Sequence, residues 1–229
     1  MTIPIKIISK QEYLKNNQKP DQENVWDNIS IPWAKYVVKK VPAVEEFLKD
    51  KKGKVIDIGC GSGRNMIPNK DIEYYAVDFS SCQLGNSMMY AKDSNVKAKF
   101  FKLKANKLSK KDFKENMFDA GLFIATLHCM DSKQEREEAL KELYRILKKG
   151  SEALITVWDS NDARFNGLKG DIYMNWREEG KEYFRYYYLY DKQELIDLLR
   201  GAGFEILEIY GESLHDRFSK KNWIIRIRK

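Results

Sequence analysis

Val55-Ile56-Asp57-Ile58-Gly59-Cys60-Gly61-Ser62-Gly63-Arg64 joins an apolar run to three alternating glycines and is the most informative segment of the chain. A second apolar run, Tyr74-Tyr75-Ala76-Val77-Asp78, ends on an acid twenty-one residues after Asp57. In an α/β protein this pairing predicts a nucleoside-binding crevice at the carboxyl ends of adjacent parallel strands. The glycines let the backbone turn sharply and approach a ligand closely. Asp78 is at the right distance to accept hydrogen bonds from two ribose hydroxyls.

The spacing of the glycines separates two kinds of nucleoside cofactor. The dinucleotide fingerprint is G-x-G-x-x-G, whereas Gly59, Gly61 and Gly63 form G-x-G-x-G, with Asp57 two places before the first. The pattern resembles that of class I S-adenosylmethionine-dependent methyltransferases. That cofactor has no phosphate and carries a cationic methionine moiety, so a preceding acid suits it better than it suits a pyrophosphate. We therefore expect S-adenosylmethionine, with a nicotinamide oxidoreductase as an alternative.

Composition indicates one folded domain without a membrane segment. The 229 residues, 43% of them hydrophobic and 33% charged, are enough for a complete doubly wound sheet. The N-terminus lacks the apolar core of a signal peptide, and no apolar run reaches the ~18–20 residues needed to span a bilayer. Cys60, Cys82 and Cys129 form no C-x-x-C pair, so we expect no metal site and a reduced, cytoplasmic compartment.

The positive charge of the chain is clustered. The net charge is +7, and the basic residues gather at Lys35–Lys54, Lys97–Lys114 and Lys220–Lys229. Basic clusters interleaved with aromatic residues are typical of a polyanion-binding surface. Ordinary solvated faces are the alternative interpretation.

Hydrophobic periodicity predicts a Rossmann-like α/β fold in a single domain, 1–229. Residues 1–50 have the apolar spacing of helices. Capping boxes at Ser132 and Asp191 begin two further helices, the first of which is expected to end at Lys148–Gly150. We expect strands at 54–59, 73–78, 98–105, 118–127, 152–158, 204–210 and 223–228. The alternation predicts a mostly parallel seven-stranded sheet with an antiparallel C-terminal end and helices on both faces.

An aromatic insert at 160–190 follows the fifth strand and is too long for a plain connector. Because long loops at the carboxyl edge of such sheets tend to carry function, we interpret it as a substrate cap. A local aromatic core is the alternative, and the two are compatible.

Several motifs resemble the tRNA wobble-uridine carboxymethyl methyltransferases over nearly the whole chain after residue 20. They are Val25-Trp26-Asp27-Asn28-Ile29, Pro42, Ala125-Thr126-Leu127-His128, Val157-Trp158-Asp159, Asp171–Trp176, Arg185-Tyr186-Tyr187, and the terminal Asp216-Arg217 and Asn222-Trp223. The resemblance implies methylation of the carboxylate of 5-carboxymethyluridine in tRNA to its methyl ester. It also implies a candidate partner, the small zinc-ribbon activator protein of eukaryotic members.

The resemblance assigns roles to individual residues. A carboxylate nucleophile is already ionised at neutral pH, so the site needs donors that hold an anion rather than a strong base. His128, Arg185 and Tyr187 suit that task as catalytic residues. The expected cofactor residues are Asp57, Gly59, Cys60, Gly61, Gly63, Asp78, Phe79, Ala105, Asn106 and Ala125. The expected substrate residues are Trp26, Lys35, Trp158 and Tyr186.

The chain departs from the family pattern at four places. An arginine of the family is replaced by Val37, for which Lys35, Lys39 or Lys40 could substitute. Two histidines are replaced by Cys129 and Tyr188. The acid after the third strand is absent, which leaves the Ala105 backbone and the Asn106 side chain for the adenine edge. A small-molecule methyltransferase and a non-catalytic nucleoside- or tRNA-binding module therefore stay as alternatives.

Overall fold

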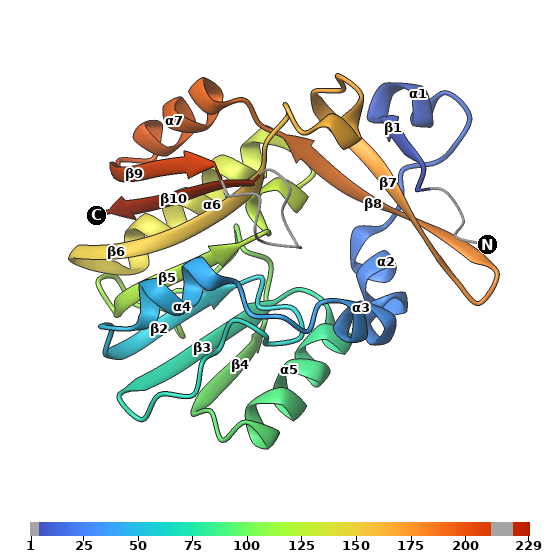
Figure 1. Cartoon of the computed structure of the whole chain (residues 1–229). Coiled ribbons are helices and arrows are strands. Elements are labelled where there is room, and N and C mark those ends of the chain that lie inside the picture. The colour runs from blue at the N-terminus through green and yellow to red at the C-terminus, as the bar shows by residue number, and fades with distance from the viewer. Residues whose placement is uncertain (1–4, 212–221) are drawn as a thin grey trace.

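A computed structural model describes residues 5–211 and 222–229; His215 and the Asp216-Arg217 motif lie outside the described residues. A seven-stranded sheet with the order β4-β3-β2-β5-β6-β10-β9 forms its centre (Figure 1). Five strands are parallel, and β10 pairs antiparallel with both β6 and β9. The strands are β2 Gly53–Ile58, β3 Ile72–Asp78, β4 Ala98–Lys102, β5 Phe118–Ile124, β6 Leu147–Trp158, β9 Glu205–Gly211 and β10 Asn222–Arg228. The predicted sheet is confirmed.

Helices cover both faces of this sheet. One face packs against α4 (Pro42–Leu48) and α5 (Ser81–Asp93), and the other against α6 (Lys133–Ile146) and α7 (Lys192–Gly201). Successive strand residues point into opposite layers, as Val55 and Ile56 of β2 do, which explains why the strands are apolar throughout. The Ser132 and Asp191 side chains accept backbone N–H groups at the starts of α6 and α7, so both predicted caps are present.

Several predicted boundaries were wrong. The strand predicted at 118–127 ends at Ile124, and the strand predicted at 152–158 begins at Leu147. The helix α6 ends at Ile146 rather than at Lys148–Gly150, because Leu147 already pairs with Phe118 as the first residue of β6. The third predicted strand ends at Lys102 rather than at residue 105. Its only described neighbour, β3, ends at Asp78, which pairs with Lys102, and the chain then turns away.

The insert at 160–190 forms a β-hairpin. Its strands are β7 (Gly170–Glu178) and β8 (Lys181–Leu189), preceded by the short 3₁₀ helix η2 (Ala163–Phe165). Near the N-terminus, β1 (Ile7–Ser9) adds antiparallel to β7 and completes a three-stranded sheet. This sheet lies beyond the carboxyl ends of the central strands (Figure 1).

The prediction that the N-terminal region is wholly helical was therefore wrong. Its helices are α1 (Lys10–Leu14), α2 (Gln22–Asn28) and α3 (Ser30–Tyr36), but β1 precedes them as a strand. The β-branched pair Ile7-Ile8 favours extended backbone, and pairing with β7 satisfies groups that the hairpin alone would leave open on that edge.

Both faces of the hairpin are buried. On one face Ile172, Met174 and Tyr187 pack with Trp158. On the other, the ring of Tyr173 lies 4.7 Å from that of Tyr13 in α1. The aromatic residues of the insert thus form a local core, as the alternative interpretation predicted.

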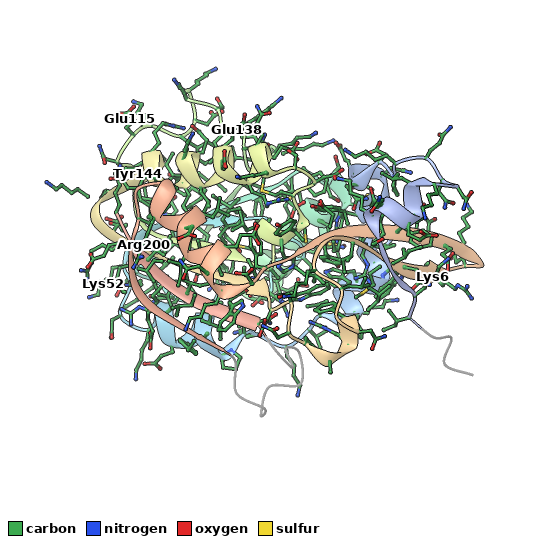
Figure 2. The ribbon with its side chains drawn as sticks, turned by 90° about the horizontal axis from the view of Figure 1, so that it is seen from above. Lys6, Lys52, Glu115, Glu138, Tyr144 and Arg200 are labelled. Carbon is green, nitrogen blue, oxygen red and sulfur yellow. The ribbon has the colours of Figure 1, made fainter. Side chains whose placement is uncertain are left out.

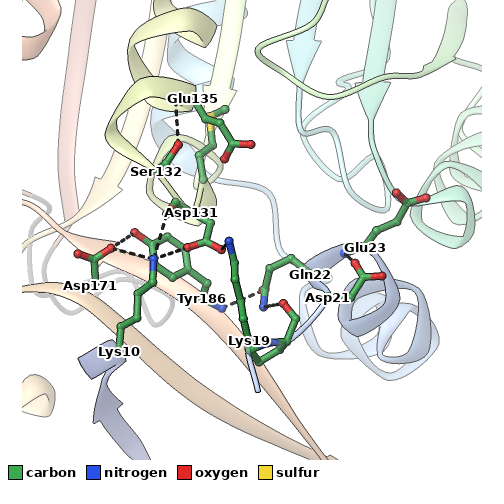
Figure 3. A network of polar contacts seen from close by, with 12 residues as sticks. Lys10, Lys19, Asp21, Gln22, Glu23, Asp131, Ser132, Glu135, Asp171 and Tyr186 are labelled. Carbon is green, nitrogen blue, oxygen red and sulfur yellow. Dashed lines mark hydrogen bonds and ion pairs between the residues drawn. The ribbon is translucent and has the colours of Figure 1, made fainter. Parts of the chain in front are cut away.

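A polar cluster fixes the N-terminal segment to the hairpin and to the start of α6 (Figure 3). The ammonium groups of Lys10 and Lys19 lie 2.6 and 2.5 Å from the two carboxylate oxygens of Asp131. Beside them, the Tyr186 hydroxyl donates to Asp171 at 2.5 Å. These contacts connect three segments that are far apart in the sequence and hold the hairpin against the body of the domain.

The amino edge of the central sheet carries a separate ion network. Glu152, only 13% exposed, contacts Lys51, Arg226 and Arg228 at 2.9, 3.1 and 3.3 Å. Figure 2 shows Lys52 at this end of the molecule and Lys6 at the opposite end. In residues 5–211 and 222–229, no helix has the length and apolarity required to cross a bilayer.

Candidate functional site

The glycine loop follows β2 at the carboxyl edge of the sheet. Gly59, Gly61 and Gly63 have φ angles of +70°, +53° and +87°, which glycine adopts without strain. A Cβ atom at Gly59 would lie 2.2 Å from the side chain of Thr126, and one at Gly63 would lie 2.9 Å from Ser87 Oγ. Two of the three glycines are therefore required by space as well as by conformation.

Asp57 lies beneath this loop and is fully buried. Neither of its carboxylate oxygens has a hydrogen-bond partner among the described residues. Burial raises its pKa to about 7, the Asp78 carboxylate adds to the rise, and Arg64 opposes it. A buried carboxylate without a partner is costly, so the arrangement suits a cationic ligand group such as the amino group of a methionine moiety.

Asp78 ends β3 on the other side of the loop. Its two carboxylate oxygens accept the backbone N–H groups of Gly61 and Ser80, each at 2.9 Å. Burial raises its pKa to about 6, while these N–H donors act in the opposite direction. Each oxygen keeps acceptor capacity, so the carboxylate can also receive the two hydroxyls of a ribose.

A cavity opens between the glycine loop and the carboxyl ends of β3, β4 and β5. The predicted cofactor residues that line it are Gly59, Cys60, Gly61, Asp78, Phe79, Ala105 and Ala125. Asp57 and Gly63 are buried and do not line the cavity. Asn106 is also outside the lining, because its side-chain amide donates to Glu138 of α6 at 2.9 Å. Leu103 and Ala105 therefore form an apolar side of the cavity.

The far end of the cavity is formed by residues after β5. Ala125 has φ +52°, a strained angle for a residue with a Cβ, and its N–H donates to Thr156 Oγ1 at 2.9 Å. Cys129, which replaces a family histidine, lines the cavity and donates its thiol to the Ala125 carbonyl at 3.4 Å. Burial raises the pKa of this thiol, so it stays protonated.

His128 belongs to the 3₁₀ helix η1 (Leu127–Cys129) and is 1% exposed. Its Nδ1 accepts the backbone N–H of Trp158 at 3.2 Å, which leaves the proton of the neutral ring on Nε2. Burial lowers the pKa of His128 to about 3, and the positive charge of Arg164 contributes. The imidazole is therefore a neutral hydrogen-bond donor at physiological pH.

Arg185 of β8 is buried beside two indole rings. Its guanidinium carbon lies 5.1 Å from the ring centre of Trp33 and 5.2 Å from that of Trp176. One terminal nitrogen donates to the Tyr187 hydroxyl at 3.0 Å and the other to the Asn175 carbonyl at 3.2 Å. Its Nε has no partner within the described ranges.

Arg164 of η2 brings a second guanidinium to the same aromatic cluster, and sequence reasoning missed it. Its guanidinium carbon lies 4.5 Å from the Trp158 ring, whose centre is 4.0 Å from that of Tyr187. Its Nε lies 3.0 Å from Asp162, but its buried Nη2 has no partner in the part of the chain that the structure describes. Its place in a long carboxyl-edge insert was the signal that could have identified it.

The structure separates some of the residues predicted to bind substrate. Tyr186 points to the opposite face of the hairpin from Tyr187, toward Asp171. The Lys35 side chain is exposed and does not line the cavity. Trp26 does line it, together with Trp33, whose ring lies 5.2 Å from that of Trp26 and which sequence reasoning did not select.

Two further observations concern residue 37 and the potential metal ligands. Val37, which replaces the family arginine, is 6% exposed and forms part of the cavity wall. Among the described residues, no group of three or more His, Cys, Asp or Glu side chains could hold a metal ion.

Comparison with known proteins agrees with this geometry. Residues 33–209 match a family described as a methyltransferase domain. The tRNA (carboxymethyluridine(34)-5-O)-methyltransferase of Schizosaccharomyces pombe is 29% identical over 211 residues, covering 80% of this chain and 88% of the relative. The protein of the same name from Arabidopsis thaliana is 26% identical over 170 residues, covering 69% of this chain but only 38% of the relative.

Solved structures show the same fold. A SAM-dependent methyltransferase from Methanosarcina mazei superposes with a TM-score of 0.64 at 22% identity, covering 82% of this chain and 97% of the other. The 1,6-didemethyltoxoflavin-N1-methyltransferase of Burkholderia thailandensis, determined with bound 1,6-didemethyltoxoflavin and S-adenosylhomocysteine, gives a TM-score of 0.66 at 17% identity. The coverage is 93% of this chain and 92% of that one.

Proposed function

This chain belongs to the methyltransferase domain family, and we propose that it methylates an ionised carboxylate on a wobble uridine of tRNA to give the methyl ester. The family match, the glycine loop, Asp57 and Asp78 support an S-adenosylmethionine-binding half of the site. The proposal concerns the acceptor half.

The observation that carries the proposal is the pair of incompletely paired guanidinium groups. Arg164 and Arg185 lie beside the rings of Trp158 and Tyr187, which are tilted at 32° to each other, and each arginine has a buried nitrogen without a hydrogen-bond partner among the described residues. An unsatisfied buried cation is costly, so such a site favours an anionic ligand. A carboxylate matches the planar guanidinium donors in shape and charge.

Among the described residues, His128 and Tyr187, two titratable groups that pack against Trp158, are poor bases, and this supports the same conclusion. The pKa of His128 is about 3, and burial raises the pKa of Tyr187 well above its ordinary value. Neither group is therefore suited to remove a proton from a hydroxyl or amine acceptor at neutral pH. A carboxylate has no proton to lose, so alignment and exclusion of water are the main requirements.

Each residue has a defined task in this proposal. When bound, S-adenosylmethionine would supply a methyl group on a sulfonium sulfur: a carboxylate oxygen would bond to the methyl carbon in line as the carbon–sulfur bond breaks, and the sulfur would leave as a neutral thioether. Arg164 and Arg185 hold the carboxylate, and the Nε2–H of His128 is a further donor. The Trp158 and Tyr187 rings exclude water and give a flat surface for a nucleobase. Arg164 also supplies the positive charge that Val37 does not.

The choice of tRNA as substrate rests on the two curated relatives reported above, both of which are named as carboxymethyluridine methyltransferases. The test is incubation of the protein with methyl-labelled S-adenosylmethionine and bulk tRNA, followed by nucleoside mass spectrometry. We expect label in a uridine derivative, and we expect mild alkali to release it because methyl esters hydrolyse whereas N- and C-methyl groups do not.

Matched variants test the acceptor site. R164Q and R185Q should lose transfer while retaining S-adenosylhomocysteine binding. R177Q is the control, because Arg177 lies on the same hairpin but pairs with Glu182 at its surface. Alkali-stable label in tRNA would refute the carboxylate acceptor. Cofactor binding without transfer to any tRNA pool would favour a non-catalytic module, and transfer only to small acids would favour a small-molecule enzyme.

A further inference from the structure

Residues 31–40 form an exposed segment that is both apolar and basic. Ile31, Tyr36 and Val38 have exposed fractions of 62%, 61% and 67%, unusually high for such side chains. The same ten residues contain Lys35, Lys39 and Lys40 and no acid. Below, these ten residues are called the basic segment.

The basic segment lies directly beside the cofactor cavity. Trp33 and Val37 point inward and line the cavity, while their neighbours remain at the surface. The Tyr36 ring contacts the Trp176 ring of the hairpin, with their centres 5.8 Å apart. On the other side, Arg64 of the glycine loop donates to the Lys39 carbonyl at 3.3 Å. The segment is thus held between the hairpin and the glycine loop.

Several lysines and arginines of the other basic clusters form ion pairs with glutamates. Lys97 and Lys99 both lie 3.4 Å from Glu73, and Arg226 and Arg228 contact Glu152. Within residues 5–211 and 222–229, no ion pair is formed by any of the three lysines of the basic segment. Their charge is therefore available for an anionic partner.

We propose that the basic segment binds the single-stranded RNA around the target nucleotide. Its lysines contact phosphates, and Tyr36 stacks on a base next to the one that enters the cavity. This inference rests on the proposed function, because it assumes that the acceptor is part of an RNA. Exposed aromatic rings among unpaired lysines are the usual surface for single-stranded nucleic acid. An anionic membrane would also match apolar and basic residues, but the continuity of Tyr36, Trp33 and Trp176 with the cavity favours a nucleic-acid strand leading into it.

The electrostatic part is tested with a synthetic anticodon stem-loop RNA and the full-length protein. The variant K35Q/K39Q/K40Q should bind it more weakly, and its affinity should depend less on salt. Loss of three phosphate contacts reduces the slope of log affinity against log salt by about 2. K110Q/K111Q/K114Q is the matched control: it removes the same charge at three exposed lysines near the end of α6, where Arg145 donates to the Phe113 carbonyl.

The stacking part is tested at Tyr36. Y36A should weaken binding of the stem-loop roughly 5- to 100-fold, which corresponds to the loss of one base–aromatic stack, whereas Y36F should bind as the wild type does. Y210A is the control, since Tyr210 is 40% exposed on β9. Unchanged melting temperature and S-adenosylhomocysteine affinity in Y36A would show that the fold and the cofactor site are intact.

The outcomes separate this inference from the proposed function. If the wild-type protein methylates tRNA but the segment variants and their controls bind the stem-loop equally well, the basic segment is not the RNA surface and the function stands. If the stem-loop binds through the segment but no tRNA is methylated, the inference stands and the function fails. If the segment variants lose binding to phosphatidylserine vesicles and keep RNA affinity, a membrane is the partner and the inference is wrong.

Discussion

Replacement of Asp57 with Asn should stabilise the cofactor-free protein above pH 7 and abolish cofactor binding. The pKa of Asp57 is raised from an ordinary 3.8 to about 7, chiefly by burial. The folded protein therefore binds this proton more tightly than the unfolded chain does, and stability falls as pH rises from about 4 to about 7. The difference between the two pKa values corresponds to about 4 kcal/mol of stability lost above pH 7.

Asn removes the charge but leaves a buried amide with unsatisfied hydrogen-bonding groups, which costs about 1–3 kcal/mol. The expected net gain for D57N is therefore about 1–3 kcal/mol at pH 8. At pH 5 the wild-type carboxyl is largely protonated and the gain should vanish. Guanidinium unfolding of the cofactor-free proteins, followed by tryptophan fluorescence at both pH values, measures this difference. Titration calorimetry with S-adenosylhomocysteine measures the loss of binding.

Asp119 is the matched control because the same substitution should act with the opposite sign. Although burial opposes it, contacts from the Lys148 ammonium and the Lys54 backbone N–H hold the pKa of Asp119 below its ordinary value. D119N should therefore destabilise the protein at pH 8. If D57N is less stable than the wild type at pH 8 while D119N behaves as expected, the reasoning about an uncompensated Asp57 is refuted.

Three further predictions concern single residues. G59A should lose cofactor binding because its Cβ would lie 2.2 Å from the Thr126 side chain, whereas G85A, which has open space within α5, should raise stability by about 0.5–1 kcal/mol; calorimetry and thermal melting check both. With saturating cofactor, the methyl-transfer rate should show no titration near pH 6.5 from His128, and a step there that disappears in H128N would contradict the assigned neutral state. Despite burial, basic partners lower the pKa of Glu152 to about 2, so its stabilisation is present above pH 4.5 and is lost as pH falls toward 2; E152Q should flatten that part of the acid unfolding curve.

The glycine loop and the two acids beside the cavity could be predicted because their determinants are local in sequence. A glycine pattern between a strand and a turn specifies the loop, and the Asp57-to-Asp78 spacing brings two acids to the ends of neighbouring parallel strands. Asn106 was harder to place, since its side chain is directed by a contact with Glu138 on a helix that comes later in the chain. No local pattern contains that information.

The proposed acceptor half depends on pairing between distant segments. The aromatic hairpin is buried on both faces, so β7 and β8 lack the alternation of apolar and polar residues that normally reveals a half-buried strand. The sequence therefore suggested a capping loop, and neighbouring Tyr186 and Tyr187 were assigned to one site. In the hairpin they point to opposite faces, because successive side chains in a strand alternate. The pairing of β1 with β7 could not be predicted either, because a strand of three residues is too short to show a periodic pattern of apolar residues.

Val37, at the position of the family arginine, shows why comparing this chain with the family residue by residue is least informative in the proposed acceptor half of the site. A guanidinium can be supplied from any element that reaches the acceptor, because the attraction between opposite charges depends on distance and burial and not on the origin of the side chain. Here α3 contributes the apolar Val37 to the cavity wall, while η2 contributes Arg164 beside Trp158. Its positive charge also acts on two of the catalytic candidates: it adds to burial in lowering the pKa of His128, and it opposes the rise that burial causes in the pKa of Tyr187. The proposed carboxylate acceptor therefore requires positive charge near the Trp158 and Tyr187 rings rather than an arginine at residue 37.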